Sequence, residues 1–385
     1  MIKTFHEIYE NRHKYAENWK ALTNGKVLGY YDTYFPEEVA YAAGILPIRI
    51  LAKHEEDDST DRLMYGNCYV TRDMLNQFVK GRYDYVDGIV CVESCQWWYN
   101  AFDTTTIAVP KLWNYYMFVP DYPDARSSRD TLRSELEAFK KRIESWSGQE
   151  ITEESLDRAI AVYNKNRLLL RRLYNLRRFD RSVVLGSEVM EVMLACQVMD
   201  KAEANDLLEA LLPELENREP YEDRVRLMLV GSETYDAELE KLVESAGANI
   251  VIDELDNGTG YIWNDVIEQK DRLMAIGLRY LSKPHSALKD NVWRRRLEQI
   301  FQLCEDYHAD GVIIAKQIYC HPHGSDMYAV WKLLRERGIP YHTFERDTTL
   351  PREEVLLGVE ALINMIKPGM TRLKGWSKKS AEVSE

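Results

Sequence analysis

The sequence has few cysteines, no long apolar run and no long basic tract, and each absence excludes a class of protein. Six cysteines in 385 residues are too few for a disulfide scaffold, so we expect thiols that are buried or bind metal in a reducing compartment. No apolar stretch approaches the ~20 residues of a membrane span. The 50 basic and 63 acidic residues give a net charge of −13, which argues against nucleic acid or an anionic membrane as partner.

Two nucleotide-binding signatures are also missing. No Gly-x-x-x-x-Gly-Lys-Ser/Thr stretch occurs, so we do not expect this chain to hydrolyse ATP by itself. Gly231 and Ser232 follow an apolar run but lack the rest of the dinucleotide fingerprint, and we interpret them as a tight turn. The first residues predict a charged amphipathic helix rather than a signal peptide, and we expect a cytoplasmic protein.

The arrangement of apolar residues predicts an α/β fold. A chain of 385 residues is too long for one ordinary core, and its 45% hydrophobic residues are enough to fill two. Apolar runs of strand length alternate with helical patterns, which is typical of parallel sheets. We expect strands over residues 26–31, 46–51, 87–92, 106–110, 225–230, 249–253, 311–318 and 341–344.

These units predict three regions along the chain. We expect an N-terminal α/β domain over residues 1–150, a helical connector packed on it over 151–218, and a C-terminal α/β domain over 219–385. Each domain should be a doubly wound parallel sheet, and the two should face each other across a cleft.

The loop after residue 318 carries unusual chemistry. It follows the apolar strand 311–318 and precedes a helical pattern that Gly338 and Pro340 end, so it lies at the carboxyl end of a strand in a βαβ unit. Ligands bind at that edge in open α/β sheets. The loop contains Cys320, His321 and His323, a thiol and two imidazoles that suit soft metals.

Three of the six cysteines have similar surroundings. Cys68, Cys95 and Cys320 each lie where a helix begins, beside Gly, Ser or His, and such thiols have a lowered pKa and suit a soft metal. The spacing alone leaves open whether they share one site. The other three, by contrast, lie in apolar patterns and are interpreted as core residues: Cys91, Cys196 and Cys304.

A zinc site is the alternative reading of this loop. Cys320, His321, His323 and Cys95 offer zinc ligands, but none of the common zinc spacings is present. The two histidines are better interpreted as acid–base groups or as donors to a ligand. Glu93 has a similar interpretation, and a helix cap is the other one.

Three motifs resemble one known family. They are TYFPEEVAYAAGILPIRIL, VESCQWWYN and QIYCHPHGSDMYAVWKLLRERGIPYHTFERD, and they resemble the family that joins benzoyl-CoA reductase subunits to 2-hydroxyacyl-CoA dehydratase subunits. The resemblance implies a four-iron four-sulfur (4Fe-4S) cluster at the cleft between two doubly wound domains. Its ligands would be Cys68 in YGNCYV, Cys95 in VESCQ and Cys320 in IYCHPH.

The same resemblance implies an activity. The chain looks most like the smaller, C-type (gamma) cluster-bearing subunit of an ATP-dependent, ferredoxin-linked benzoyl-CoA reductase, an oxidoreductase that reduces the aromatic ring of an acyl-CoA thioester by one-electron steps to a cyclic diene. The alternatives are a subunit of a radical 2-hydroxyacyl-CoA dehydratase and a non-catalytic electron-relay partner.

The resemblance also implies site residues and partners. His323, His321 and Glu93 would act at the reacting group, and Trp97 and Tyr99 would line a pocket for the ring. The implied partners are a related cluster-bearing subunit, ATP-hydrolysing iron–sulfur activator subunits and, indirectly, ferredoxin.

Overall fold

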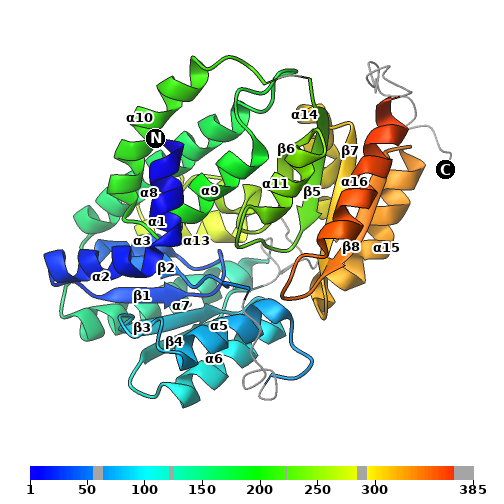
Figure 1. Ribbon diagram of the computed structural model, residues 1–385. Helices are drawn as coiled ribbons and strands as arrows, with labels where there is room; N and C mark the ends of the chain where they lie inside the picture. Colours follow the sequence, from blue (N-terminus) through cyan, green and yellow to red (C-terminus); the bar gives the residue numbers. More distant parts are fainter. Residues whose placement is uncertain (55–63, 121–124, 222, 284–292, 368–385) are drawn as a thin grey trace.

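The chain forms two parallel sheets of four strands each. The computed structural model describes residues 1–54, 64–120, 125–221, 223–283 and 293–367. Within them the strand orders are β2-β1-β3-β4 and β6-β5-β7-β8, and every pair of neighbours is parallel. Figure 1 shows the first sheet at the lower left and the second at the right, each flanked by helices. The predicted α/β class with two parallel sheets is confirmed.

The first sheet is built by the first third of the chain. Its strands are β1 (Val27–Tyr30), β2 (Leu46–Arg49), β3 (Gly88–Val92) and β4 (Trp113–Met117). The helices of this region are α1 (Ile2–Glu10), α2 (Arg12–Thr23), α3 (Glu37–Ala42), α5 (Tyr69–Val79), α6 (Gln96–Ala108) and α7 (Arg126–Ser147).

The second sheet follows three long helices. Those helices are α8 (Glu153–Asn175), α9 (Gly186–Cys196) and α10 (Lys201–Glu216). The strands are β5 (Val225–Gly231), β6 (Ala248–Glu254), β7 (Gly311–Gln317) and β8 (Tyr341–Arg346). The remaining helices are α11 (Glu238–Ser245), α12 (Thr259–Ile262), α13 (Arg272–Leu281), α14 (Trp293–Asp306), α15 (His321–Glu336) and α16 (Arg352–Ile366). In the described part of the chain, no helix has the length and apolar character needed to cross a membrane.

Alternation along the strands divides the first sheet into two buried faces. Leu28 and Val90 pack with apolar residues of α3, α7 and α13, whereas their neighbour Ile89 packs on the opposite face with α5 and α6. Both faces are covered, as parallel sheets require. Helix α13 follows β6 in the chain, yet its Gly277 lies against α7, where a Cβ would come within 2.9 Å of Leu136. The later part of the chain therefore helps to close the first core.

The helical segment between the sheets contacts both of them. Helix α8 packs on α3 beside the first sheet, whereas α9 packs on β6 and α11 of the second sheet and on α1. Tyr9 of α1 donates a hydrogen bond to the carbonyl of Tyr235, which follows β5. The expectation that the segment packs on the first domain alone therefore accounts for α8 only.

One predicted strand is wrong. Residues 106–110 do not form a strand, because α6 continues to Ala108 and the fourth strand is β4. The hydroxyl groups of Thr105 and Thr106 donate hydrogen bonds to the carbonyls of Ala101 and Asp103, which satisfies them within the preceding turn. These threonines are therefore compatible with a helix, and the chain turns into β4 only after Pro110.

Glu240 of α11 is a carboxyl group sealed inside the second half of the molecule. Its side chain is 1% exposed, and neither oxygen is hydrogen-bonded to another residue in the described part of the chain. Burial, with a contribution from the charges of Asp236 and Glu244, raises the pKa of Glu240 to about 8. The folded chain holds this proton more tightly than the unfolded chain does. The resulting stability is complete below the ordinary pKa of about 4.5 and is lost as the pH rises through about 8.

Glu240→Gln is expected to remove this pH dependence. Between about pH 6 and about pH 9, the free energy of unfolding of the unchanged chain should fall by roughly 2–3 kcal/mol more than that of the variant. Urea unfolding at each pH measures the difference. Parallel pH profiles for the two chains would show that Glu240 is ionised in the folded state.

Candidate functional site

Three cysteines occupy the same position on three helices. Cys68, Cys95 and Cys320 are the N-cap residues of α5, α6 and α15, and each has an extended or nearly extended backbone there. None of the three side chains accepts a capping hydrogen bond from its own helix. Helix N-termini favour negative charge and lower the cost of forming a thiolate. The thiols are therefore positioned for metal rather than used as caps.

Sheet topology explains where two of these cysteines lie. In each sheet the direction of strand addition reverses once, between β1 and β3 and again between β5 and β7. Ligands bind in the crevice that such a reversal opens at the carboxyl ends of the strands. Cys95 follows β3 and Cys320 follows β7, so each lies at the crevice of its own sheet. Across the first crevice, the hydroxyl of Ser94 donates a 3.0 Å hydrogen bond to Asp32, which follows β1.

The three thiols are close enough to influence one another. Burial, and then the neighbouring Cys68 and Cys320, raise the pKa of Cys95 to about 12. Burial and the neighbouring Cys68 also raise the pKa of Cys320 to about 12, and burial raises that of Cys68. Cys68 and Cys320 are 7% and 6% exposed, and Cys95 is partly exposed. Residues far apart in the sequence thus share one environment.

The two aromatic residues proposed for substrate binding lie on different sides of α6. Trp97 contacts the Cys320 loop: its indole N–H donates a 2.9 Å hydrogen bond to the carbonyl of Tyr319, and its ring meets His321 edge-on at 5.1 Å. Tyr99 is two positions further along the helix, about 200° around its axis. It packs edge-on against Tyr116 of β4 at 5.2 Å and is 41% exposed. Of this pair, only Trp97 is shown in contact with a cysteine loop.

The candidate acid–base residues differ in exposure. His321 is exposed at the first position of α15 and faces Trp97, whereas His323 is fully buried. Neither ring nitrogen of His323 has a hydrogen-bond partner in the described part of the chain. Burial, with the charges of Arg296 and Lys316, lowers the pKa of His323 far below its ordinary value, so its ring is neutral. Glu93 is partly buried, and its backbone N–H donates to the carbonyl of Met117 at the end of β4.

The zinc alternative has no support in this arrangement. Among the described residues, no group of three or more His, Cys, Asp or Glu side chains is placed to hold a single metal ion. His323 in particular lies in the interior beside two cations. The remaining cysteines are core residues as predicted: Cys91, Cys196 and Cys304 are buried among apolar side chains.

Sequence reasoning missed a set of buried charges between the sheets. Arg49, at the end of β2, forms an ion pair with Glu233, which follows β5, and both side chains are at most 2% exposed. Asp256, which follows β6, is paired with Lys283 at 3.0 Å, and both of these side chains are fully buried. Thr33 donates a hydrogen bond to Asp256 from the first sheet. The signal in the sequence is that polar residues directly follow buried parallel strands.

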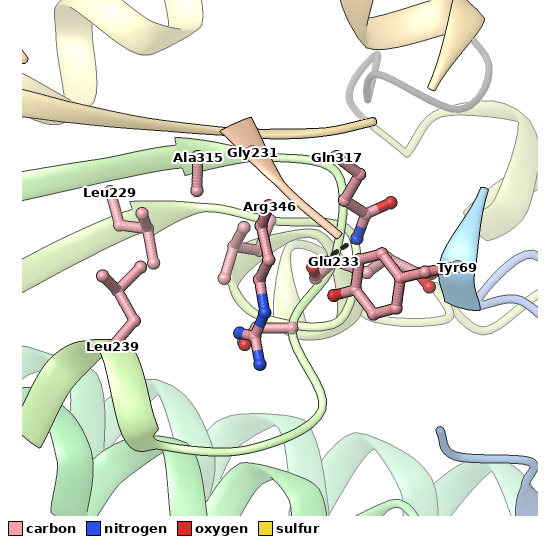
Figure 2. Close-up of a pocket in the computed structure, with 10 residues that line it drawn as sticks. Tyr69, Leu229, Gly231, Glu233, Leu239, Ala315, Gln317 and Arg346 are labelled. Carbon is pink, nitrogen blue, oxygen red and sulfur yellow. Dashed lines mark hydrogen bonds between the residues drawn. The ribbon is translucent and has the colours of Figure 1, made fainter. Parts of the chain in front are cut away.

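A small cavity lies beside this set, at the carboxyl ends of β5, β7 and β8. Figure 2 shows Tyr69, Gln317 and Arg346 turned toward it, with Glu233 at its edge. The space leaves about 10 Å³ for the centre of a water molecule, which is room for about one water. Gln317 donates a 2.9 Å hydrogen bond to the carbonyl of Glu233. The cavity is too small for an organic substrate and separates Tyr69, the neighbour of Cys68, from the second sheet.

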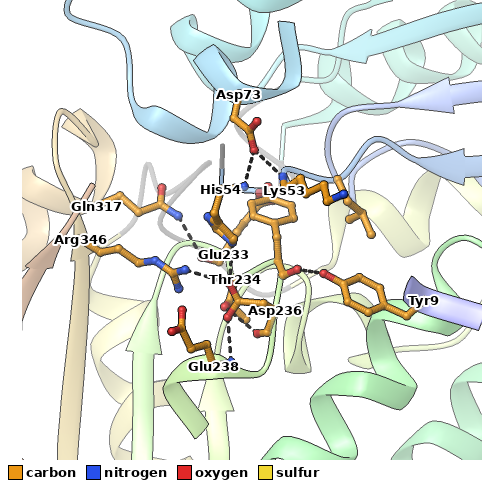
Figure 3. A network of polar contacts seen from close by, with 12 residues as sticks. Tyr9, Lys53, His54, Asp73, Glu233, Thr234, Asp236, Glu238, Gln317 and Arg346 are labelled. Carbon is orange, nitrogen blue, oxygen red and sulfur yellow. Dashed lines mark hydrogen bonds and ion pairs between the residues drawn. The ribbon is translucent and has the colours of Figure 1, made fainter. Parts of the chain in front are cut away.

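A polar network continues from the cavity toward the first sheet (Figure 3). Asp236 is paired with Arg346 at 2.8 Å and with His54 at 2.7 Å. Burial raises the pKa of Asp236, but the contact with His54 and the charge of Arg346 outweigh it, and the net shift is downward. Asp73 of α5 accepts a hydrogen bond from the backbone N–H of His54. The network ties the start of α5 to both sheets.

Comparison with known proteins identifies the family. The family model described as 2-hydroxyglutaryl-CoA dehydratase, D-component, matches residues 32–366. This chain belongs to that family. The match spans both sheets and all three N-cap cysteines, so the D-component family shares the whole framework described above rather than one half of it.

Named relatives of this D-component family member match it over most of their length. It is 24% identical to the (R)-phenyllactyl-CoA dehydratase beta subunit of Clostridium sporogenes over 91% of this chain and 94% of the relative. It is 26% identical to the C-type benzoyl-CoA reductase subunit of Thauera aromatica, over 86% and 88%. It is 23% identical to the beta subunit of the (R)-2-hydroxyglutaryl-CoA dehydratase of Acidaminococcus fermentans, over 89% and 92%. The similarity is nearly the same for each, so identity alone does not separate reductase from dehydratase.

Proposed function

We propose that this chain holds a 4Fe-4S cluster through Cys68, Cys95 and Cys320 and works as one subunit of an enzyme that transforms an acyl-CoA thioester by radical chemistry. The observation that carries the proposal is the placement of three cysteines at three helix N-termini, with thiols near enough to shift one another's pKa. Membership of the D-component family supports the same conclusion.

The donor set fits such a cluster. Cysteine thiolates are the usual ligands of iron–sulfur clusters, and the converging helix N-termini stabilise their negative charge. Burial keeps these thiols protonated until metal displaces the protons. A cluster bound by three thiolates supplies one-electron transfer at low potential and leaves one iron without a protein ligand.

The chain's own side chains hold the cysteine loops in place. The Ser94–Asp32 hydrogen bond fixes the loop that ends in Cys95, and the Arg49–Glu233 pair fixes the loop after β5 against the first sheet. Near-complete burial of Arg49 and Glu233 keeps water out of the space between the sheets. A site that is dry and rigid on this side favours electron transfer without loss to solvent.

We place the chain first in the benzoyl-CoA reductase branch, as a C-type subunit of an ATP-dependent reductase. Support comes from its similarity to the C-type benzoyl-CoA reductase subunit and from the aromatic side chains around the cysteine loops. Reducing the ring to a diene takes two electrons and two protons. Trp97 and Tyr99 are proposed to contact the ring, and His321 and Glu93 to deliver protons, because both of these residues are reachable from solvent. His323 is proposed to support the loop from inside.

A radical 2-hydroxyacyl-CoA dehydratase is the second candidate. The similarity to a phenyllactyl-CoA dehydratase beta subunit over 91% of the chain favours it specifically, since phenyllactyl groups are also aromatic. The two branches would use the same cysteines and differ in the fate of the electron. In the dehydratase the electron is returned after a 2-hydroxyl group leaves, whereas in the reductase it stays in the product.

The proposed partners follow from what the chain lacks. It has no phosphate-binding loop with which to couple ATP hydrolysis to electron transfer. We therefore propose ATP-hydrolysing iron–sulfur activator subunits, supplied with electrons by ferredoxin, and a related cluster-bearing subunit that completes the enzyme.

An anaerobic assay tests the proposed function. The chain alone, given a strong reductant, ATP and benzoyl-CoA, is expected to show no turnover. Activity should appear when the related subunit and the activator are added, as loss of benzoyl-CoA and formation of the diene. (R)-Phenyllactyl-CoA in the same mixture tests the dehydratase branch. Turnover by the isolated chain would contradict the dependence on partners, and turnover of (R)-phenyllactyl-CoA alone would move the chain to the second candidate.

A further inference from the structure

Trp97 connects two of the cysteine loops directly. It lies two residues after Cys95, in the first turn of α6, and its indole N–H donates to the carbonyl of Tyr319 at 2.9 Å. Tyr319 is the residue before Cys320. One side chain therefore joins the Cys95 end of the first sheet to the Cys320 end of the second, across 222 positions of sequence.

The bonded carbonyl belongs to the peptide group that precedes Cys320. That group is planar, so its carbonyl oxygen and the N–H of Cys320 turn together. The N–H of Cys320 donates to the carbonyl of Gln317 at 3.0 Å, and the oxygen on the other side accepts from Trp97. Both ends of the peptide plane are held, and the direction in which the Cys320 side chain leaves the backbone is held with them.

The backbone of Tyr319 needs this support. Its φ is +62°, in the left-handed region that residues other than glycine seldom adopt. The Tyr319 side chain is 49% exposed, and among the described residues no hydrogen bond of its hydroxyl is seen. The contacts that oppose relaxation of this turn are those of its backbone and the edge-on contact between the Trp97 and His321 rings.

We infer that Trp97 is a positioning residue that sets Cys320 at its working distance from Cys95. The assignment rests on the proposed function for its purpose, since the distance matters because both thiols hold one cluster. The geometric part stands without it. Trp97 acts through the Tyr319 carbonyl, so the indole N–H is the required group and the Tyr319 side chain is dispensable.

The geometric part is tested on the metal-free chain. Cys68→Ser leaves Cys95 and Cys320 as the pair at the site, and dibromobimane, which becomes fluorescent when it has alkylated two neighbouring thiols, reports how readily they are bridged. Peptide mapping identifies the Cys95–Cys320 bridge. Trp97→Phe, which keeps a ring and removes the N–H, is expected to lower the bridging rate about fivefold, the change that loss of one such hydrogen bond produces.

Trp331→Phe is the matched control. Trp331 lies on α15, the helix that Cys320 begins, and its indole N–H donates to Thr343 at 3.0 Å. The variant loses the same kind of hydrogen bond away from the cysteines, so its bridging rate should equal that of the parent chain. A fivefold loss in this control would show that general loosening of the fold explains the effect of Trp97→Phe, and would overturn the inference.

Tyr319 provides a second arm that does not depend on how well the Trp97 variant folds. Tyr319→Gly keeps the carbonyl and tolerates a positive φ, so bridging should be retained. Tyr319→Val disfavours that φ because it is β-branched, and bridging should fall about fivefold. Equal rates in these two variants, or an unchanged rate in Trp97→Phe, would overturn the inference.

A measurement on the iron-loaded chain then separates this inference from the proposed function. Transfer of iron to a ferrous chelator under anaerobic conditions should be about fivefold faster in Trp97→Phe than in Trp331→Phe. A chain that takes up no iron at all contradicts the proposed function, and the bridging rates still decide the role of Trp97.

Discussion

Replacing Cys320 with serine is expected to lower the iron bound by the anaerobically purified chain by about tenfold or more, because a serine hydroxyl is a poor ligand for an iron–sulfur cluster. Cys68→Ser and Cys95→Ser should have the same effect. Each removes one of three thiols that lie on separate helices and share one environment, and the remaining two cannot close the site. Iron and acid-labile sulfide, measured per chain, report the loss.

Cys196→Ser and Cys304→Ser are the matched controls. Both thiols are buried in the apolar core, and Cys304 lies beside Met228 rather than near the other cysteines. These variants are expected to lose some stability, since a hydroxyl replaces an apolar thiol, and to keep their iron. Equal loss of iron in all five variants would mean that the measurement reports unfolding, and the assignment of three ligands would fail.

Arg49→Leu is expected to have the largest effect on stability, a loss of about 3–5 kcal/mol in the free energy of unfolding. Burial lowers the pKa of Arg49, but Glu233, Asp256 and Asp32 outweigh it and keep the guanidinium charged. Without this cation, Glu233 is left in the interior without its partner. Urea unfolding of the metal-free chain measures the cost.

Two comparisons show whether the effect comes from the buried charge. Lys316→Met removes an ion pair with Glu345 in which the two side chains are 28% and 55% exposed, and exposed pairs contribute about 1 kcal/mol or less. The double variant Arg49→Leu with Glu233→Leu removes both buried charges and should recover part of the loss. A loss in Arg49→Leu no larger than that in Lys316→Met would contradict the role given to the pair.

Much of the fold could be predicted because parallel strands buried on both faces leave a simple pattern. The run that ends at Gln317 is apolar, begins at a glycine and is followed by a helical pattern, and β7 occupies it. The same pattern predicts the helix that begins after Cys68 with its observed limits, Tyr69–Val79. The N-cap placement of the cysteines follows from these limits, because a residue between a strand and a helix lies at the start of the helix.

The rest depends on contacts that no local pattern encodes. Arg49 and Glu233 are 184 positions apart, and each would be interpreted as a surface charge until the two sheets are brought together. His323 follows Cys320 closely in sequence, yet the turn of α15 carries its ring into the interior while His321 stays exposed. Residues 106–110 fail for a related reason. Their β-branched side chains favour a strand locally, and hydrogen bonds to the preceding turn stabilise a helix instead.

The most direct test of the central claim is an anaerobic count of iron and acid-labile sulfide in the purified chain, with an EPR spectrum after reduction by dithionite. We expect about four irons and four sulfides per chain and a reduced-state signal of a 4Fe-4S cluster, carried by Cys68, Cys95 and Cys320. A folded chain with all six thiols free, less than about one iron and no signal after anaerobic reconstitution with iron and sulfide would contradict it.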